Sequence, residues 1–200
     1  MHGINGISMG AYKYIKENFQ KEYSERSELY RSNVSAWRKD AAVVRLEAPT
    51  NIARARELGY RAKPGVIIAR VRTSKGMSKR IKPRGGRKPS KSGRFFSYVK
   101  SLQSVAEDRA ARRYSNAEVL NSYYIGEDGK YKFFDVILLD RSHSAITSDP
   151  IYNGIINSKG RSFRGLTSSG LKHRGIRYKG RGAINNRPSV RASHRGVKVI

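Results

Sequence analysis

Two long stretches of this chain carry many basic side chains and no acid. Residues 61–100 hold 14 Lys and Arg without one Asp or Glu, and residues 151–200 hold 12 without one. Within them, residues 74–93 and 158–196 concentrate Gly, Ser and Pro and offer few apolar groups whose burial could offset the cost of ordering the backbone, roughly 1–2 kcal/mol per residue. We therefore expect both to take their shape by neutralising a polyanion, because phosphate neutralisation supplies free energy that a small core cannot.

The remaining charge is nearly balanced, so the two blocks account for most of the total. Lys and Arg number 42 against 15 Asp and Glu, a formal net charge of +27 over 200 residues. The chain has no cysteine, which excludes disulfides, thiolate metal sites and cysteine nucleophiles. No apolar stretch is long enough to span a membrane and the start lacks a signal-peptide pattern, so we expect a cytoplasmic protein.

Apolar periodicity predicts helices outside the basic blocks. Spacings of three and four indicate two N-terminal helices and a later one. The apolar positions are Ala11, Ile15, Phe19 and Tyr23 in the first helix, Tyr30, Val34, Trp37 and Ala41 in the second, and Leu102, Val105, Ala106 and Ala110 in the third. A shorter helix is expected over residues 51–58, because Gly59 supplies a termination signal.

Three β-branched or aromatic segments predict strands, at residues 66–72, 119–125 and 131–140. The last two are joined through a glycine-containing loop at 126–130, which favours a hairpin at the centre of the sheet. The predicted fold class is α+β, a small antiparallel or mixed sheet with packed helices, plus long basic extensions that we expect to be embedded in nucleic acid. The expected divisions are an N-terminal extension (1–8), a helical region (9–60), an α+β core (61–150) with a basic arm at 73–97, and a basic C-terminal extension (151–200).

Candidate phosphate contacts follow from the mixture of Lys, Arg and Gly in the blocks. Arg presents a planar fork to phosphate oxygens, Lys a point charge, and Gly lets the backbone approach closely. In the first block the candidates are Arg70, Arg72, Lys75, Lys79, Arg80, Lys82, Arg84, Arg87, Lys88, Lys91 and Arg94. In the second they are Arg161, Arg164, Lys172, Arg174, Arg177, Lys179, Arg181, Arg187, Arg191 and Arg195.

Aromatic residues among these bases have two interpretations. Phe163, His173 and Tyr178 could stack on unpaired bases, or they could anchor the segment on its own domain. The sequence leaves both open.

No catalytic or metal site is predicted. Glu107 and Asp108 are neighbours on a helix, so they point about 100° apart and do not face one another; we expect them on a solvated helix face. The four histidines are too scattered for a metal motif. The chain is not expected to be an enzyme.

Six segments, taken in order, resemble one known family. They are Met9–Ile15, Arg54–Lys63, Lys100–Ala110, Val119–Tyr123, Tyr131–Leu138 and Arg164–Thr167. Together they resemble protein fifteen of the large ribosomal subunit in its archaeal and eukaryotic form, and an archaeal-type member fits best.

The resemblance implies an α+β ribosomal protein with basic extensions threaded into large-subunit ribosomal RNA, no catalytic activity and no required cofactor. Mg²⁺ associated with the RNA is compatible with it, without a dedicated protein site. It also implies RNA contacts at Arg54, Arg56, Arg61, Lys63 and Arg164. The expected partners are large-subunit ribosomal RNA and neighbouring ribosomal proteins, with no membrane and no homo-oligomer.

The leading hypothesis is a structural constituent of the large ribosomal subunit that binds and stabilises ribosomal RNA during translation and assembly. An architectural DNA-binding protein and an RNA-processing enzyme stay as alternatives, because phosphate contacts read from a sequence do not separate RNA from DNA.

Overall fold

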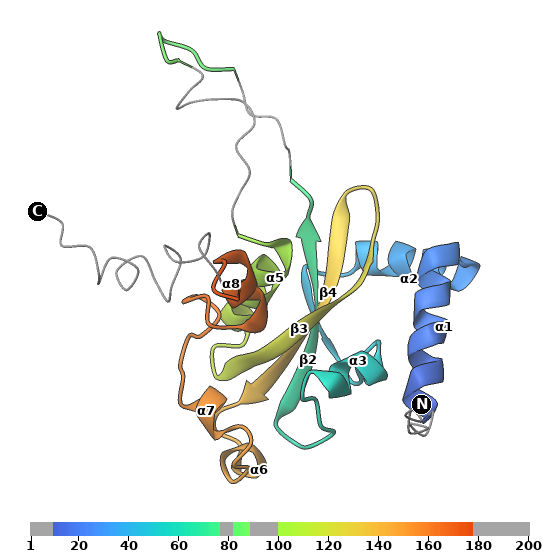
Figure 1. The fold of residues 1–200 in the computed structure, drawn as a ribbon, viewed down its shortest axis with the longest axis vertical. Helices are drawn as coiled ribbons and strands as arrows, with labels where there is room; N and C mark the ends of the chain where they lie inside the picture. The colour runs from blue at the N-terminus through green and yellow to red at the C-terminus, as the bar shows by residue number, and fades with distance from the viewer. Residues whose placement is uncertain (1–9, 77–81, 89–99, 178–200) are drawn as a thin grey trace, which may run out of the picture.

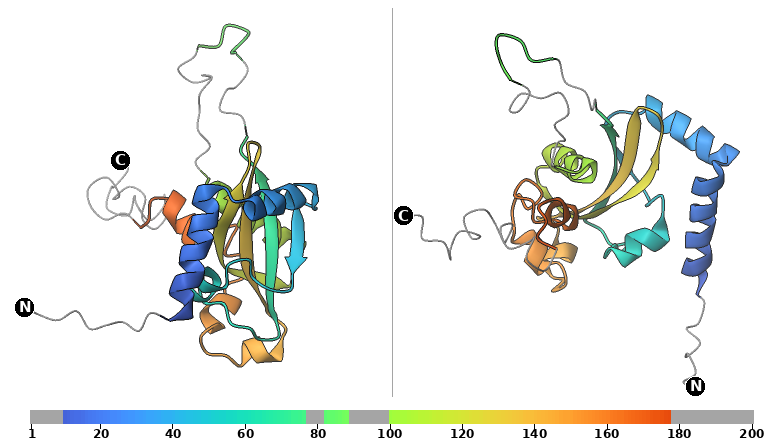
Figure 2. Two further views of the ribbon diagram at one scale, coloured as in Figure 1. Left: turned by 90° about the vertical axis from the view of Figure 1, so that its right-hand side faces the viewer. Right: turned by 45° about the horizontal axis from the view of Figure 1, so that its top comes forward.

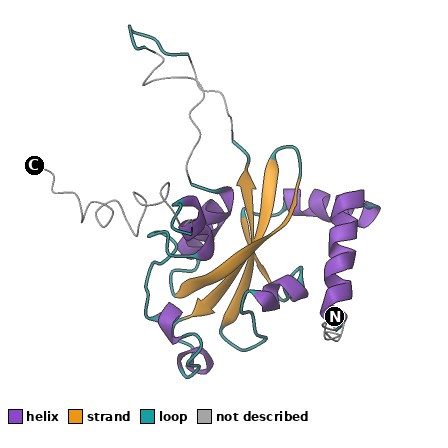
Figure 3. Cartoon of the chain, viewed as in Figure 1, coloured by secondary structure: helices purple, strands orange, loops and turns teal. Residues whose placement is uncertain are grey.

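A four-stranded antiparallel sheet with helices on both faces forms the centre of the molecule (Figures 1 and 3). The computed structural model describes residues 10–76, 82–88 and 100–177. The predicted α+β class is confirmed, and of the two expected sheet types the antiparallel one is observed.

The strands are β1 (Val43–Leu46), β2 (Val66–Ser74), β3 (Ala117–Glu127) and β4 (Tyr131–Asp140), in the spatial order β1-β2-β4-β3. The predicted hairpin is β3–β4, but only β4 is central. The prediction is wrong for β3, which forms an edge, because β2 pairs along the other side of β4. Residues 133–139 of β4 are all buried, as expected of a strand covered on both faces.

Helix α5 (Leu102–Arg113) covers one face of the sheet. Ser101 caps its N-terminus by accepting a hydrogen bond from the Ser104 backbone N–H. Its alanines, Ala106 and Ala110, are fully buried against strand residues such as Val136. Small side chains let this helix lie close to the sheet.

Helices α2 (Glu28–Lys39) and α3 (Ile52–Glu57) cover the opposite face. In α2 the predicted apolar positions Tyr30, Val34 and Trp37 are buried at spacings of four and three, whereas the fourth, Ala41, lies beyond the end of the helix and is exposed. Both predicted helices therefore exist near their expected bounds.

Helix α1 (Ala11–Glu25) stands at the outer side of this layer, away from α5 and α8 (Figure 2). The helix is confirmed, but none of its residues is buried. Phe19 and Tyr23 pack against the second core cluster, whereas Ile15 remains 38% exposed. The apolar face read from the sequence is thus only partly covered by this chain.

The C-terminal region differs from expectation over its described part. Residues 144–177 form α6 (Ser144–Thr147), α7 (Asn153–Ile156) and α8 (Ser168–His173). Tyr152 and Ile156 join Leu139 and Ile146 in a third core cluster. We expected residues 158–196 to lack packing of their own, but hydrogen bonds from Arg161, Thr167 and Ser169 fasten the described part of this segment to β3 and α5. Residues 178–200, like the predicted extension 1–8, lie outside the described residues.

Candidate nucleic-acid interface

Several acidic side chains of the domain are buried. Five carboxylic side chains are buried: Glu107, Asp108, Glu118, Asp135 and Asp149. Buried acids contribute little to the field at the surface, while most Lys and Arg of the described residues reach it. The surface is therefore more positive than the composition alone indicates.

Glu107 lies in a cluster of hydroxyl groups between α5, β3 and α8. Its carboxyl group is fully buried and accepts hydrogen bonds from Ser122 Oγ (2.5 Å), Thr167 Oγ1 (2.5 Å) and Ser169 Oγ (2.7 Å). The expectation of a solvated helix face is therefore wrong for Glu107 and also for Asp108, which is buried and pairs with Lys100. The α5 face that carries Glu107 is covered by β3 and α8, which the helical period of α5 could not reveal.

Asp135 forms a second buried polar cluster on the α2–α3 side of the sheet. It accepts hydrogen bonds from Tyr123 Oη (2.9 Å) and the Thr50 backbone N–H (3.1 Å). Arg70 Nε lies 3.8 Å from its Oδ1, and the guanidinium sits 4.4 Å from the Trp37 ring centroid. Burial raises the pKa of Asp135 and lowers the pKa of Arg70, while the attraction between the two opposes both shifts. Arg70 thus contributes to the packing of the domain through its contacts with Asp135 and Trp37.

Two more of the residues predicted to contact RNA, Arg161 and Arg72, donate hydrogen bonds to backbone carbonyl oxygens. Arg161 NH1 donates to the carbonyl oxygens of Val119 (2.7 Å) and Leu120 (3.1 Å), which fastens the C-terminal segment to β3. Arg72 donates to the Arg38 carbonyl oxygen. RNA contact by Arg70, Arg72 and Arg161 stays a prediction, but the structure gives each a role in the fold.

A third set of predicted contacts lies at the surface beside single acids. Lys63 Nζ is 2.7 Å and Arg61 NH1 3.8 Å from Asp149 Oδ2, so one carboxyl group faces two cations. Hydrogen bonding to Lys63 holds the pKa of Asp149 below its usual range. Lys75 pairs with Glu127 at 3.3 Å.

The predicted contacts on α3 face α1. Arg54 NH1 donates to Glu57 Oε2 (2.5 Å), and Lys16 Nζ of α1 reaches Glu57 Oε1 (3.2 Å). These two hydrogen bonds, that from Arg54 being the stronger, hold the pKa of Glu57 below its usual value. Arg56 lies over the Tyr12 ring at 5.2 Å from its centroid. This surface is basic and aromatic together.

Residues 82–88 of the first arm present an exposed turn. Gly85 and Gly86 both have positive φ, +68° and +73°, which side chains with a Cβ rarely adopt. Arg84 and Arg87 flank this turn and are exposed, as are Lys82 and Lys88. The glycines let the chain reverse with two guanidinium groups beside the turn. Four other candidates of this arm lie outside the described residues: Lys79, Arg80, Lys91 and Arg94.

The predicted C-terminal contacts divide in the same way. Arg174 NH1 donates to the carbonyl oxygens of Arg164 (3.2 Å) and Gly165 (3.0 Å), which closes the turn before α8. Arg164 is exposed and donates to Ser158 Oγ, Arg177 donates to Ser168 Oγ, and Lys172 is exposed. The remaining candidates, Lys179, Arg181, Arg187, Arg191 and Arg195, lie outside the described residues.

Sequence reasoning missed two exposed bases at the end of α5. Arg112 and Arg113 occupy its last turn, and the Arg112 guanidinium lies 5.7 Å from the ring centroid of Phe163. Phe163 is 48% exposed, so its ring is accessible rather than buried as an anchor. The bases escaped notice because residues 101–150 carry a net negative charge; a cationic last helical turn was the signal that could have found them.

Within residues 10–76, 82–88 and 100–177, no group of three or more His, Asp or Glu is placed to hold a metal ion. The same residues include no helix that is long and apolar enough to cross a membrane.

Comparison with protein families gives one match that covers most of the chain. A family model described as Ribosomal L15 matches residues 10–193. The matched range includes the sheet, all the described helices and both basic blocks almost in full. It confirms the resemblance seen in the sequence.

Proposed function

This chain belongs to the Ribosomal L15 family, a family of structural proteins of the large ribosomal subunit, and we propose that it binds and stabilises large-subunit ribosomal RNA through its basic arm and C-terminal extension. The arm and the extension neutralise phosphates where RNA segments converge, while the sheet domain fixes where each of them starts. The proposal assigns no catalytic residue, no dedicated cofactor and no homo-oligomer to the chain, and places it in cytoplasmic ribosomes.

One observation carries the proposal: the chain separates its charges in space. Several acids are buried within the domain, as with Glu107 and Asp135, and the acids that stay exposed, such as Glu25, Glu28 and Glu47, lie outside the two basic blocks. Exposed bases gather on the turn at residues 82–88. The block that contains this turn, residues 61–100, has no acid. Such a separation suits a partner with dense, irregular negative charge, which folded RNA provides.

The test is the salt dependence of RNA binding. Replacing Arg84, Arg87 and Lys88 with Ser should reduce the slope of log K against log salt by about 0.7–0.9 for each phosphate that is no longer neutralised. The matched control replaces three exposed bases on α1 and α2, Lys21, Arg31 and Lys39, and should leave the slope unchanged. An equal slope in the arm variant and the wild type would mean that these side chains do not touch phosphate.

Cosedimentation separates the ribosomal function from the DNA-binding alternative. The full-length protein should remain with large subunits through a moderate salt wash and be absent from chromatin. Recovery on chromatin, or free in the supernatant, would contradict the proposed function.

A further inference from the structure

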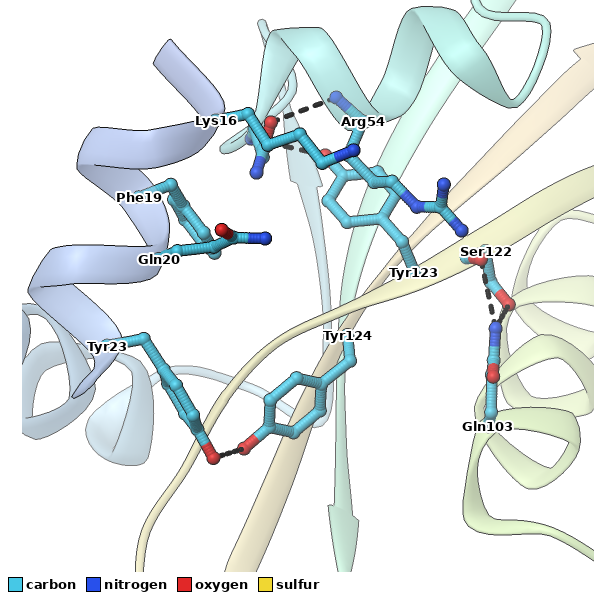
Figure 4. Close-up of a pocket in the computed structure, with 10 residues that line it drawn as sticks. Lys16, Phe19, Gln20, Tyr23, Arg54, Gln103, Ser122, Tyr123 and Tyr124 are labelled. Atoms are coloured by element: carbon cyan, nitrogen blue, oxygen red, sulfur yellow. Dashed lines mark hydrogen bonds between the residues drawn. The ribbon is translucent and has the colours of Figure 1, made fainter. Parts of the chain in front are cut away.

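A groove of about 540 Å³ lies between α1, α3 and the β3 edge of the sheet (Figure 4). Phe19 and Tyr23 of α1 pack against the second core cluster and Lys16 pairs with Glu57 of α3, but no residue of α1 is buried, so the space between this helix and β3 stays open. Its volume lies within the roughly 300–1,000 Å³ of sites that bind small molecules or parts of larger ones.

One end of the groove is aromatic. Tyr23 of α1 and Tyr124 of β3 meet edge to face with ring centroids 5.8 Å apart, and their hydroxyl oxygens are 3.2 Å apart. Phe19 extends this wall along α1, one helical turn before Tyr23 (Figure 4). This end offers apolar surface and ring edges to a flat ligand.

The other end of the groove is cationic. Lys16 and Arg54 lie there, and none of the ten lining residues is an acid. Glu57, just outside the lining, faces both cations with a single carboxylate. One negative charge does not neutralise two positive ones, so this end retains a net positive charge.

Between the two ends the side chain of Gln20 extends from α1 into the groove (Figure 4). An amide both donates and accepts hydrogen bonds, so it can meet the edge of any base without selecting one strictly. Aromatic wall, amide and paired cations therefore line one groove, and they are the groups that bind, in turn, the face of a base, its polar edge and a phosphate.

We propose that this groove binds one unpaired nucleotide of ribosomal RNA, with its base against Phe19 and Tyr124, its edge at Gln20, and its phosphate at Lys16 and Arg54. The inference rests on the proposed function, because it takes the RNA partner from there. Charge complementarity favours a nucleotide over a segment of a neighbouring protein, since a peptide would need its own acid to satisfy the cationic end. Stacking on aromatic side chains is also the usual way in which proteins hold unpaired bases.

Photocrosslinking in assembled subunits tests this placement. Full-length chains carry a benzophenone amino acid in place of Gln20, of Lys21 as the matched control on α1 outside the groove lining, or of Arg84 as a reporter on the arm. After incorporation into large subunits and irradiation, position 20 should crosslink to ribosomal RNA at one unpaired nucleotide, and position 21 should not crosslink there.

The outcomes separate the two proposals. A crosslink from position 20 to a protein, or to a base-paired nucleotide, overturns the groove assignment. RNA crosslinks from position 84 without any from position 20 also overturn it and leave the proposed function standing. Subunits that take up the chain but give no RNA crosslink from either position contradict both.

A second variant avoids the bulky probe. Gln20→Ala, at an exposed helix position, should keep the fold and make one unpaired adenine or cytosine in purified subunits about fivefold more reactive to dimethyl sulfate, the factor that matches loss of about 1 kcal/mol. If the bound nucleotide is a guanine or uracil, a carbodiimide reagent reads the same change. Lys21→Ala should change neither reactivity, and an unchanged pattern with both reagents in Gln20→Ala overturns the proposal.

Discussion

Removal of the buried Glu107 carboxyl group should detach the C-terminal segment from the domain. The group joins three elements, because it accepts hydrogen bonds from Ser122 on β3 and from Thr167 and Ser169 at the start of α8. Thr167 also caps α8 by accepting a hydrogen bond from the Gly170 backbone N–H. Glu107 is therefore expected to fix the point from which the C-terminal extension leaves the domain.

The magnitude follows from what each substitution leaves behind. In Glu107→Ala three buried hydroxyl donors are left without their acceptor, and changes of this kind at buried charged groups cost about 3–5 kcal/mol in the free energy of unfolding. In Glu107→Gln one oxygen still accepts, but the amide N–H₂ faces hydroxyl groups that need an acceptor. One unsatisfied buried donor costs about 1–3 kcal/mol.

Denaturant unfolding of the RNA-free protein, followed by the fluorescence of Trp37, measures both values, and Glu17→Gln on the exposed face of α1 is the control. The control should change the free energy of unfolding by less than about 0.5 kcal/mol. Amide hydrogen exchange adds a local measurement: the Leu171 N–H, bonded to the Thr167 carbonyl oxygen at 2.8 Å, should exchange faster in both Glu107 variants. If Glu107→Ala is as stable as the control and Leu171 stays protected, the hydroxyl cluster does not hold α8.

Two further predictions concern a crowded turn and an acid-sensitive one. Gly65→Ala should lower the midpoint of denaturant unfolding. Gly65 has φ +86°, and an added Cβ would lie 2.7 Å from Ile146 and 2.8 Å from His143. A midpoint equal to that of the wild type would show that the loop relaxes freely. Burial would raise the pKa of Asp128, but backbone N–H groups in its turn and the Arg38 guanidinium outweigh burial and hold this pKa below its usual value. A depressed pKa in the folded state gives stability that is present above the unfolded value of about 3.9 and is lost as the pH falls through the folded one. Asp128→Asn should therefore be less stable than the wild type at neutral pH, with the difference shrinking in acid titrations as the pH falls below the unfolded value; a difference independent of pH would contradict this reasoning.

Much of the fold could be predicted from the sequence, because local periodicity and burial coincide. Helices α2 and α5 and strands β2 and β4 carry long apolar patterns, and each lies close to its predicted bounds. Strand β1 was not predicted, because four residues are too few to show a period. The short helices α6, α7 and α8 escaped for the same reason.

Only part of the candidate interface could be predicted from the sequence. The composition of the blocks identified where basic charge is concentrated, and the exposed turn with Arg84 and Arg87 fits that expectation. The same composition could not separate bases that face solvent from bases that hold the fold, such as Arg70 and Arg161. The partners of those two, Asp135 and the β3 carbonyl oxygens, lie far away in the sequence.

The sequence alone predicts a polyanionic partner, because net charge and the absence of acids over long segments are sums over residues that folding does not change. It also determined the family, because ordered motifs are properties of the chain itself. Tertiary structure alone decided which acids disappear from the surface, which bases remain there, and that α1 stands off to leave a groove. Those outcomes depend on pairings between distant residues, such as Glu107 with Thr167 and Tyr23 with Tyr124, and no local pattern encodes a contact across that separation.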